Sequence, residues 1–174
     1  PGIAAGTTIR SIDDASHITL SQNVLSGTSG STFIFDGNTY SGQTVIKAGT
    51  LSTTANGAFG TGSVIVGGGT GGQTTPGSFN ATLELRGVSY TNPQTLIMDG
   101  GTLSAIAGIN PLTGVSSTDS IWAGDVAFAA NSNVVVSTGS KLTLSGLLSG
   151  IGSVTQLGEG TVVFSGHADT TRNA

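Results

Sequence analysis

The residues of this chain best suited to acid–base chemistry are its carboxylates, which number nine. A polysaccharide lyase or hydrolase needs several carboxylates on one face, either to bind calcium or to act as acid and base. Here they are dispersed along the chain: Asp13, Asp14, Asp36, Glu84, Asp99, Asp119, Asp125, Glu159 and Asp169. Only Asp13 and Asp14 are adjacent, and neighbouring residues in a strand point to opposite faces. The sequence therefore predicts no catalytic acid–base pair.

Metal sites and nucleophiles have no better support. His17 and His167 have no second ligand at the spacing of a metal site, so we interpret both as surface residues. Serines are abundant, but the sequence holds neither G-x-S-x-G nor S-x-x-K. The glycine run 67–72 lacks the Gly-Lys-Ser/Thr ending of a phosphate loop. We expect no catalytic residue, no metal, no cofactor and no enzymatic activity.

Three residues are candidates for contact with a partner. Tyr90 and Trp122 lie near the borders of two predicted loops, where an exposed ring could stack on a sugar or anchor a protein. Asn110 lies within the second of these loops. The alternative for both rings is packing against the body of the protein. The expected partner is a host or matrix protein, or a glycan.

The composition describes the elements that must position these residues. Glycine contributes 29 of 174 residues, more than double its usual share of about 7%, and charged residues only 8%, against about 25% in ordinary domains. Ser, Thr and Val favour strands and turns, and glycine permits sharp bends between them. No stretch repeats apolar residues with helical spacing between caps. We expect one domain's worth of β structure with almost no helix.

Charge and cysteine content exclude some partners. The net charge is −4, and the five basic residues are scattered at Arg10, Lys47, Arg86, Lys141 and Arg172. No basic stripe can neutralise phosphates, so nucleic acid is not an expected partner. The absence of cysteine agrees with export through an oxidising compartment. The chain begins at Pro1 without a signal sequence and has no run of eighteen apolar residues, so we expect a piece excised from a longer protein.

A repeated pattern is the strongest structural signal. The segment 44–52, TVIKAGTLS, returns at 95–104 as TLIMDGGTLS, and looser echoes follow. The repeat-like units lie near 31–66, 94–104, 140–146 and 158–166. Units of this kind, each contacting its neighbours, are typical of a solenoid.

Short candidate strands occur throughout the chain. They are 17–21, 32–35, 43–47, 63–66, 82–86, 94–98, 120–123, 125–129, 133–137, 141–145 and 161–165. Glycines at strand ends and the near absence of Asn-Gly hairpin signals favour an all-β, right-handed parallel β-helix over 1–174, with a β-sandwich as the alternative. At about 20–25 residues per coil, the chain would make roughly seven or eight coils.

Two segments interrupt the strand pattern. Residues 67–79 and 105–119 are rich in Gly, Pro, Ser and Thr and are too long for bends. We expect them to project as loops, where contacts with partners concentrate. The alternative is that both are tolerated insertions without a role, because added loop length costs little entropy.

The segment 31–51, STFIFDGNTYSGQTVIKAGTL, resembles the passenger-associated repeat of autotransporter proteins. That pattern has a strand, S/D-G-x-N-T-Y-x-G, and a second strand that ends in A-G-T-L. The likeness is strong over 31–66 and partial at 158–166, where the following 167–170, HADT, departs from N-T-Y-x-G. Residues 67–157 share only composition and the echo at 94–104.

The resemblance implies a β-helical passenger displayed on a Gram-negative bacterium. Such a passenger would be attached to the outer membrane through a C-terminal barrel that lies outside this sequence, and the repeat would assist export by progressive folding. No catalytic residue is implied. The favoured function is a non-catalytic stalk or adhesin at the cell surface, and the alternative is a fragment of a β-helical polysaccharide-degrading enzyme. Open ends of a solenoid also predict end-to-end self-association.

Overall fold

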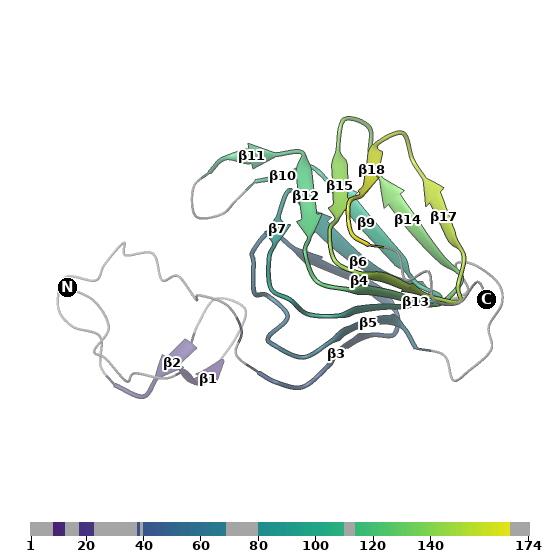
Figure 1. Cartoon of the computed structure of the whole chain (residues 1–174). Helices are drawn as coiled ribbons and strands as arrows, with labels where there is room; N and C mark the ends of the chain where they lie inside the picture. Colours follow the sequence, from purple (N-terminus) through teal and green to yellow (C-terminus); the bar gives the residue numbers. More distant parts are fainter. Residues whose placement is uncertain are drawn as a thin grey trace. The chain divides into compact units, whose positions relative to one another are not determined.

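Short strands make up the regular structure of this chain, shown as a computed structural model in Figure 1. The structure describes residues 9–12, 18–22, 38, 40–68, 80–109 and 114–167. Within these ranges there is no helix, as the sequence predicts, and accordingly no helix that could cross a membrane. The chain divides into two compact units, residues 1–35 and residues 36–174.

The first unit contains one antiparallel strand pair. β1 (Ile9–Ile12) pairs with β2 (Ile18–Leu20), with an irregularity between Ile9 and Ser11. The predicted strand 17–21 corresponds to β2, whereas 32–35 lies outside the described residues. Parallel strands begin only in the second unit, so the stacked part of the described chain is shorter than the segment predicted for 1–174.

The second unit contains three parallel sheets. Sheet I consists of β3 (Thr44–Ile46), β5 (Val64–Gly67), β8 (Leu96–Asp99), β13 (Val126–Ala130) and β16 (Leu148–Gly150). Sheet II consists of β4 (Gly49–Thr53), β6 (Ala81–Arg86), β9 (Thr102–Ile106), β14 (Ser132–Val136) and β17 (Val154–Leu157). Sheet III consists of β7 (Ser89–Tyr90), β12 (Asp119–Trp122), β15 (Lys141–Leu144) and β18 (Thr161–Phe164). Parallel pairing of this kind is consistent with a solenoid, and the antiparallel sandwich considered as the alternative lacks it.

The chain visits the three sheets in a fixed order. From β5 onward, strands of sheets I, II and III follow one another along the chain, with the pair β10 and β11 inserted between β9 and β12. The first coil contributes β3 to sheet I and β4 to sheet II, and each strand pairs with its neighbours in the same sheet. We call one pass through the sheets a coil. The described strands make five coils, because sheets I and II each contain five strands.

The lengths of the coils explain why the described strands make five coils, whereas the sequence predicted seven or eight. Thr44 pairs with Val64, 20 positions later, and Val126 pairs with Leu148, 22 positions later. Val64 and Leu96 are 32 positions apart, because residues 69–79 lie between β5 and β6. The basic coil therefore has the expected length, and insertions and the first unit account for the remaining residues.

The second predicted loop is partly ordered as strands. Within 105–119, β10 (Gly108–Ile109) and β11 (Ser116–Ser117) form an antiparallel hairpin, and Ala105 and Ile106 belong to β9. The loop prediction is thus wrong at both of its ends. Of the first predicted loop, 67–79, the structure describes Gly67, the last residue of β5, and Gly68.

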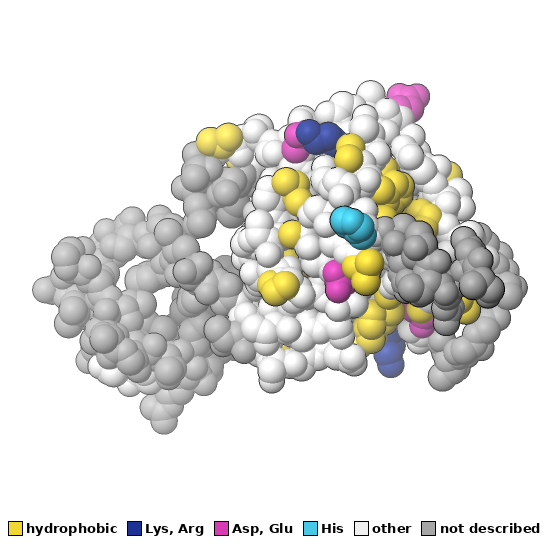
Figure 2. Space-filling view, in the orientation of Figure 1, with side chains coloured by type: hydrophobic (Ala, Val, Ile, Leu, Met, Phe, Trp, Pro, Cys, Tyr) yellow, Lys and Arg dark blue, Asp and Glu magenta, His cyan; other side chains and the backbone are white. Residues whose placement is uncertain are grey.

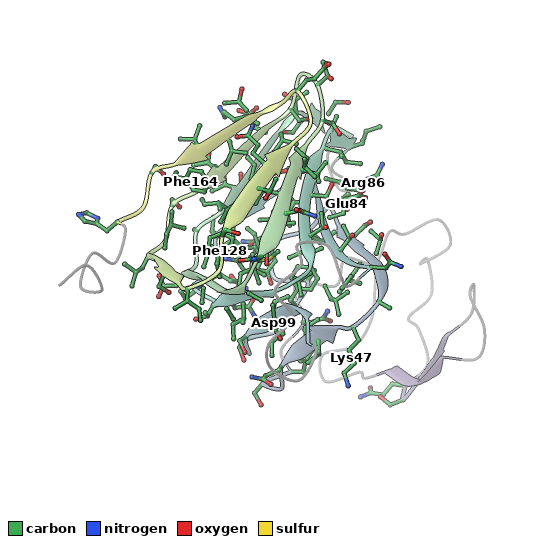
Figure 3. The ribbon with its side chains drawn as sticks, turned by 90° about the vertical axis from the view of Figure 1, so that its right-hand side faces the viewer. Lys47, Glu84, Arg86, Asp99, Phe128 and Phe164 are labelled. Carbon is green, nitrogen blue, oxygen red and sulfur yellow. The ribbon has the colours of Figure 1, made fainter. Side chains whose placement is uncertain are left out.

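The interior consists of side-chain columns that run across the coils. In sheet II, Leu51, Leu83, Leu103, Val134 and Gln156 occupy the same register. Leu83, Leu103 and Val134 are fully buried, whereas Leu51 and Gln156, in the two outermost coils, are exposed. Alternation in each strand places one residue in such a column and the next on the surface. Figure 3 shows Phe128 in the interior and Phe164 on the terminal strand β18.

Glycine forms a column of its own at the corner that leads into sheet I. Gly42, Gly62, Gly124, Gly146 and Gly166 each occupy this corner, and Gln94 occupies it in the third coil. A Cβ on Gly146 would lie 2.1 Å from the carbonyl oxygen of Gly124, and one on Gly124 would lie 1.9 Å from that of Gln94. The backbones of successive coils approach so closely here that a side chain pointing the same way would collide with the coil below.

Candidate functional site

The two aromatic candidates lie in the interior. Tyr90 on β7 and Trp122 on β12 are in register in sheet III, and both are fully buried. Their rings stack with centroids 4.7 Å apart and planes 6° apart, and Phe59 stacks on the other side of Tyr90 at 5.3 Å. The prediction that these rings contact a partner is wrong, and the alternative of packing within the body is what the structure shows. Asn110 lies outside the described residues.

A buried polar cluster surrounds Tyr90. Its hydroxyl donates to Gln94 Oε1 at 2.7 Å and accepts from the Phe59 amide at 3.1 Å. The Gln94 amide nitrogen donates to the carbonyl oxygens of Phe59, Gly60 and Gly62 at 3.0, 2.5 and 2.9 Å. Burial raises the pKa of the Tyr90 phenol above its ordinary value. The cluster is buried and joins the first, second and third coils, so its hydrogen bonds stabilise their stacking.

The indole nitrogen of Trp122 differs from the hydrogen-bonded polar atoms of the cluster around Tyr90. Among the described residues, its Nε1 is the one buried side-chain nitrogen or oxygen without a hydrogen-bond partner. Such a group costs about 1–3 kcal/mol. Stacking on Tyr90 offsets part of this cost, since an aromatic pair contributes about 0.5–1.5 kcal/mol beyond burial.

The described carboxylates are dispersed, and four of these five have a local side-chain or backbone partner. Glu84 accepts from Ser52 Oγ at 2.8 Å and pairs with Arg86 at 3.0 Å, Asp125 accepts from the Leu147 amide, and Glu159 accepts from Thr138. In Figure 3, Glu84 and Arg86 lie together and Asp99 lies well apart from them. Within the described ranges, no three His, Cys, Asp or Glu residues could share a metal ion. Asp13, Asp14, Asp36, Asp169 and His17 lie outside those ranges.

One further ion pair links two coils of sheet III. Lys141 Nζ lies 2.6 Å from Asp119 Oδ2, and both side chains are about half exposed. The hydrogen bond from Lys141 holds the pKa of Asp119 below its ordinary value. Because the pair faces water, it stabilises the sheet only weakly.

A surface groove lies where the hairpin meets the end of sheet II. It encloses about 390 Å³ and is lined by Thr54, Arg86, Ala107, Gly108, Ile109 and Ser116. Two glycines seat the hairpin: a Cβ on Gly108 would lie 2.0 Å from the Arg86 carbonyl oxygen, and one on Gly87 would lie 2.3 Å from that of Ser117. Ile109 and Val115 on the hairpin are each 61% exposed. The groove offers one guanidinium, hydroxyls and apolar surface, a set suited to binding.

Sequence reasoning missed two of these features, the role of Gln94 beside Tyr90 and the polar cluster at Arg86. Gln94 was treated as the start of a strand, although its place among the corner glycines marks it as a break in the repeat. The cluster of Ser52, Glu84 and Arg86 arises from residues up to 34 positions apart, and only the coil register brings them together. Comparison of the chain with protein families, with curated proteins and with solved structures found no match.

Proposed function

We propose that this chain is a right-handed parallel β-helical segment of an autotransporter passenger. In this proposal it is displayed outside a Gram-negative bacterium as a non-catalytic stalk or adhesin, and its coil-by-coil folding assists its own export. The resemblance of 31–66 to the passenger-associated repeat supports the proposed location at the cell surface. The observation that supports the stalk and its coil-by-coil folding is the stacking of five strands in one register in both sheet I and sheet II.

Stacking of this kind suits progressive folding. Each coil pairs only with the coils directly before and after it, as β9 does with β6 and β14. A new coil therefore finds a complete template as soon as the adjacent coil is formed, and it needs no residue from farther along the chain. At about 4.8 Å per coil, five coils extend about 20 Å, so the segment acts as a spacer that can be lengthened by repetition.

The surface supports contact with a partner and not catalysis. Outward positions on sheet II are mainly hydroxyl and amide groups in register: Thr50, Thr82, Thr102, Asn133 and Thr155. The groove beside β10 and β11 adds Arg86 and the exposed Ile109. A host or matrix protein, or a glycan, matches this mixture of hydroxyl, apolar and sparse charged groups.

Export provides the direct test. The chain would be placed before an autotransporter barrel in a Gram-negative cell, and the surface fraction would be measured by protease accessibility. Leu103→Asp places an unpaired carboxylate in the sheet II column, where Leu103 is fully buried, and should reduce display several-fold. Thr155→Asp, the matched change on an exposed position of the same sheet, should leave display near the original level. Equal display of the two variants would contradict coil-by-coil folding as the driving step.

Binding separates a stalk from an adhesin. The purified chain would be applied to arrays of glycans and matrix proteins, with polysaccharide turnover measured in parallel. An adhesin binds without turnover, and Arg86→Ala, which removes the groove's guanidinium, should weaken that binding. Turnover of a polysaccharide would refute the non-catalytic proposal.

A further inference from the structure

The groove at the end of sheet II has one charged group in its lining. Arg86 is the only charged residue among the six described residues that line it. Its partner Glu84 is not among them, and the Glu84 side chain is 18% exposed, against 43% for Arg86. Charged side chains are also few on the face shown in Figure 2, where they stand apart among uncharged ones. A molecule seated in the groove therefore meets a guanidinium without a carboxylate beside it in the lining, which favours an anionic group.

The Arg86 guanidinium is held in place before any ligand binds. Glu84 Oε1 accepts from Arg86 Nη1 at 3.0 Å and from Ser52 Oγ at 2.8 Å, and Figure 3 shows the Glu84 and Arg86 side chains together. A guanidinium carries its N–H donors in a planar fork. Since the bond to Glu84 uses Nη1, Nε and Nη2 can bind both oxygens of a carboxylate in parallel. The fixed orientation lowers the entropy that such a contact costs.

The hairpin of β10 and β11 supplies the apolar wall of the groove. Its base is seated against β6, because a Cβ on Gly108 would lie 2.0 Å from the Arg86 carbonyl oxygen and the Gly87 amide donates to the Ile106 carbonyl oxygen at 3.0 Å. Ile109, which is 61% exposed, therefore has a fixed place in the lining. The volume of about 390 Å³ lies near the lower end of the range for small-ligand sites, about 300–1,000 Å³. A sugar unit has a suitable size.

Hydroxyl groups favour a sugar over an acidic peptide as the occupant. Thr54 and Ser116 line the groove, and a hydroxyl both donates and accepts, as sugar hydroxyls do. The aliphatic side chain of Ile109 suits the C–H face of a sugar ring. An extended peptide commonly gains affinity by adding a strand to a free sheet edge. However, β6, which ends at Arg86, pairs with β4 on one side and with β9 on the other, so it offers no free edge.

Resting on the proposed function as a non-catalytic surface segment, we propose that the groove at Arg86 binds a carboxylated sugar, such as a uronate or sialate unit of an acidic glycan. The sugar carboxylate bonds Nε and Nη2 of Arg86. Sugar hydroxyls bond Thr54 and Ser116, and the C–H face of the ring packs on Ile109. The proposal narrows the partner from glycans in general to glycans that carry a carboxylate.

Matched pairs of oligosaccharides test the need for the carboxylate. The purified chain would be titrated calorimetrically with oligogalacturonate, with a hyaluronan oligosaccharide and with sialyllactose, and then with the carboxyl-reduced form of each. At least one acidic form should bind about tenfold or more tightly than its reduced form, as expected for a charge-assisted hydrogen bond. Added salt should weaken that binding. If no acidic form binds more tightly than its reduced form, the inference is overturned.

Two changes that each remove a cation locate the contact. Arg86→Gln should lower the affinity for the acidic form about tenfold or more and leave the affinity for the reduced form unchanged. Lys141→Gln is the matched control, because Lys141 is 44% exposed and is likewise paired with a carboxylate, that of Asp119 on sheet III. It should retain full binding. Arg86→Lys keeps the charge without the planar fork and should recover only part of the affinity. Unchanged binding of the acidic form by Arg86→Gln would overturn the inference.

Ile109→Ser tests the groove without disturbing the ion pair of Arg86 and Glu84. Because Ile109 is exposed, its substitution should leave the urea midpoint near the original value. Binding of the acidic and reduced forms should weaken several-fold and to the same extent, since both lose the same apolar contact. Undiminished binding of the acidic form would show that it lies elsewhere, which contradicts the assignment to this groove.

The remaining outcomes separate this inference from the proposed function. Binding of oligoglutamate as tightly as an acidic sugar, with loss in Arg86→Gln, would assign the groove to acidic peptides and overturn the sugar. Binding of a protein or neutral glycan that Arg86→Gln does not affect would support an adhesin but would overturn this inference. Cleavage of an oligosaccharide would refute the non-catalytic function, whereas the ratio of affinities for acidic and reduced forms would still test the groove.

Discussion

The corner glycine column makes a quantitative prediction about Gly124→Ala. A Cβ at Gly124 would lie 1.9 Å from the Gln94 carbonyl oxygen, and real Cβ atoms do not approach closer than 3.0 Å. The two coils would therefore have to separate by about 1 Å at this corner, against a strand spacing of about 4.8 Å. Relief of the clash strains two hydrogen bonds that cross the corner, from the Leu96 amide to Asp125 and from the Ala123 amide to Tyr90.

The expected cost follows from these two effects. Overpacking costs about 1–3 kcal/mol, and each weakened hydrogen bond adds up to about 0.5–1.5 kcal/mol. The free energy of unfolding should thus fall by about 2–6 kcal/mol, which lowers the thermal midpoint by at least about 4 °C in a chain of this size. Urea unfolding followed by the far-UV β signal measures the change in free energy directly.

Gly42→Ala is the matched control. Gly42 occupies the same corner in the first coil, where a Cβ would have nothing within 4 Å and where the glycine does not have positive φ. The substitution should be neutral or should stabilise by up to about 1 kcal/mol, because alanine restricts the unfolded chain. The reasoning is refuted if Gly124→Ala proves as stable as Gly42→Ala.

Two further predictions concern the polar cluster around Tyr90. Gln94→Gly restores the glycine found at this corner in the other coils but removes the amide that bonds three carbonyl groups. The free energy of unfolding, measured in urea, should therefore fall by about 1–3 kcal/mol. Unchanged stability would show that the cluster is not stabilising. The raised pKa of Tyr90 means that the neutral phenol is favoured in the folded state, so this contribution is complete below the unfolded pKa of about 10 and is lost as the pH rises through the folded pKa. Urea midpoints measured from pH 9 to 11.5 should decline less steeply for Tyr90→Phe than for the original chain, and identical slopes would contradict this.

Strand prediction succeeded where one strand carries its own signal. Thr82–Arg86 and Lys141–Leu144 alternate apolar and polar residues, and the structure places Leu83, Leu85, Leu142 and Leu144 in the interior. Prediction missed β4 and β9, which begin at Gly49 and directly after Gly101, where the chain bends from sheet I into sheet II, and which resemble turns in isolation. It also missed β16 and β17, which pair on one side only among the described strands and whose residues lack clean alternation. In these strands, pairing with a neighbouring coil supplies the order that local sequence does not.

The candidate site was less predictable than the fold. Tyr90 and Trp122 border predicted loops, so the sequence leaves open whether their rings contact a partner or pack against the body, and their register in sheet III turns both rings inward. Which aromatic residue faces solvent depends on the strand face, and a difference of one position in register reverses that face. The groove at Arg86 depends on a hairpin that starts more than twenty residues later, so no local pattern could show it.

By itself, the sequence determined the class of structure: abundant glycine, β-branched and hydroxyl residues with few charges and a repeating unit require short strands joined at bends. These are properties of single residues and their spacing, so they need no knowledge of partners in space. Tertiary structure alone decided the number of coils, the inward aromatic column and the cluster held by Gln94. Each of those depends on which residues lie one coil apart, and insertions of variable length between coils hide that distance from any reading along the chain.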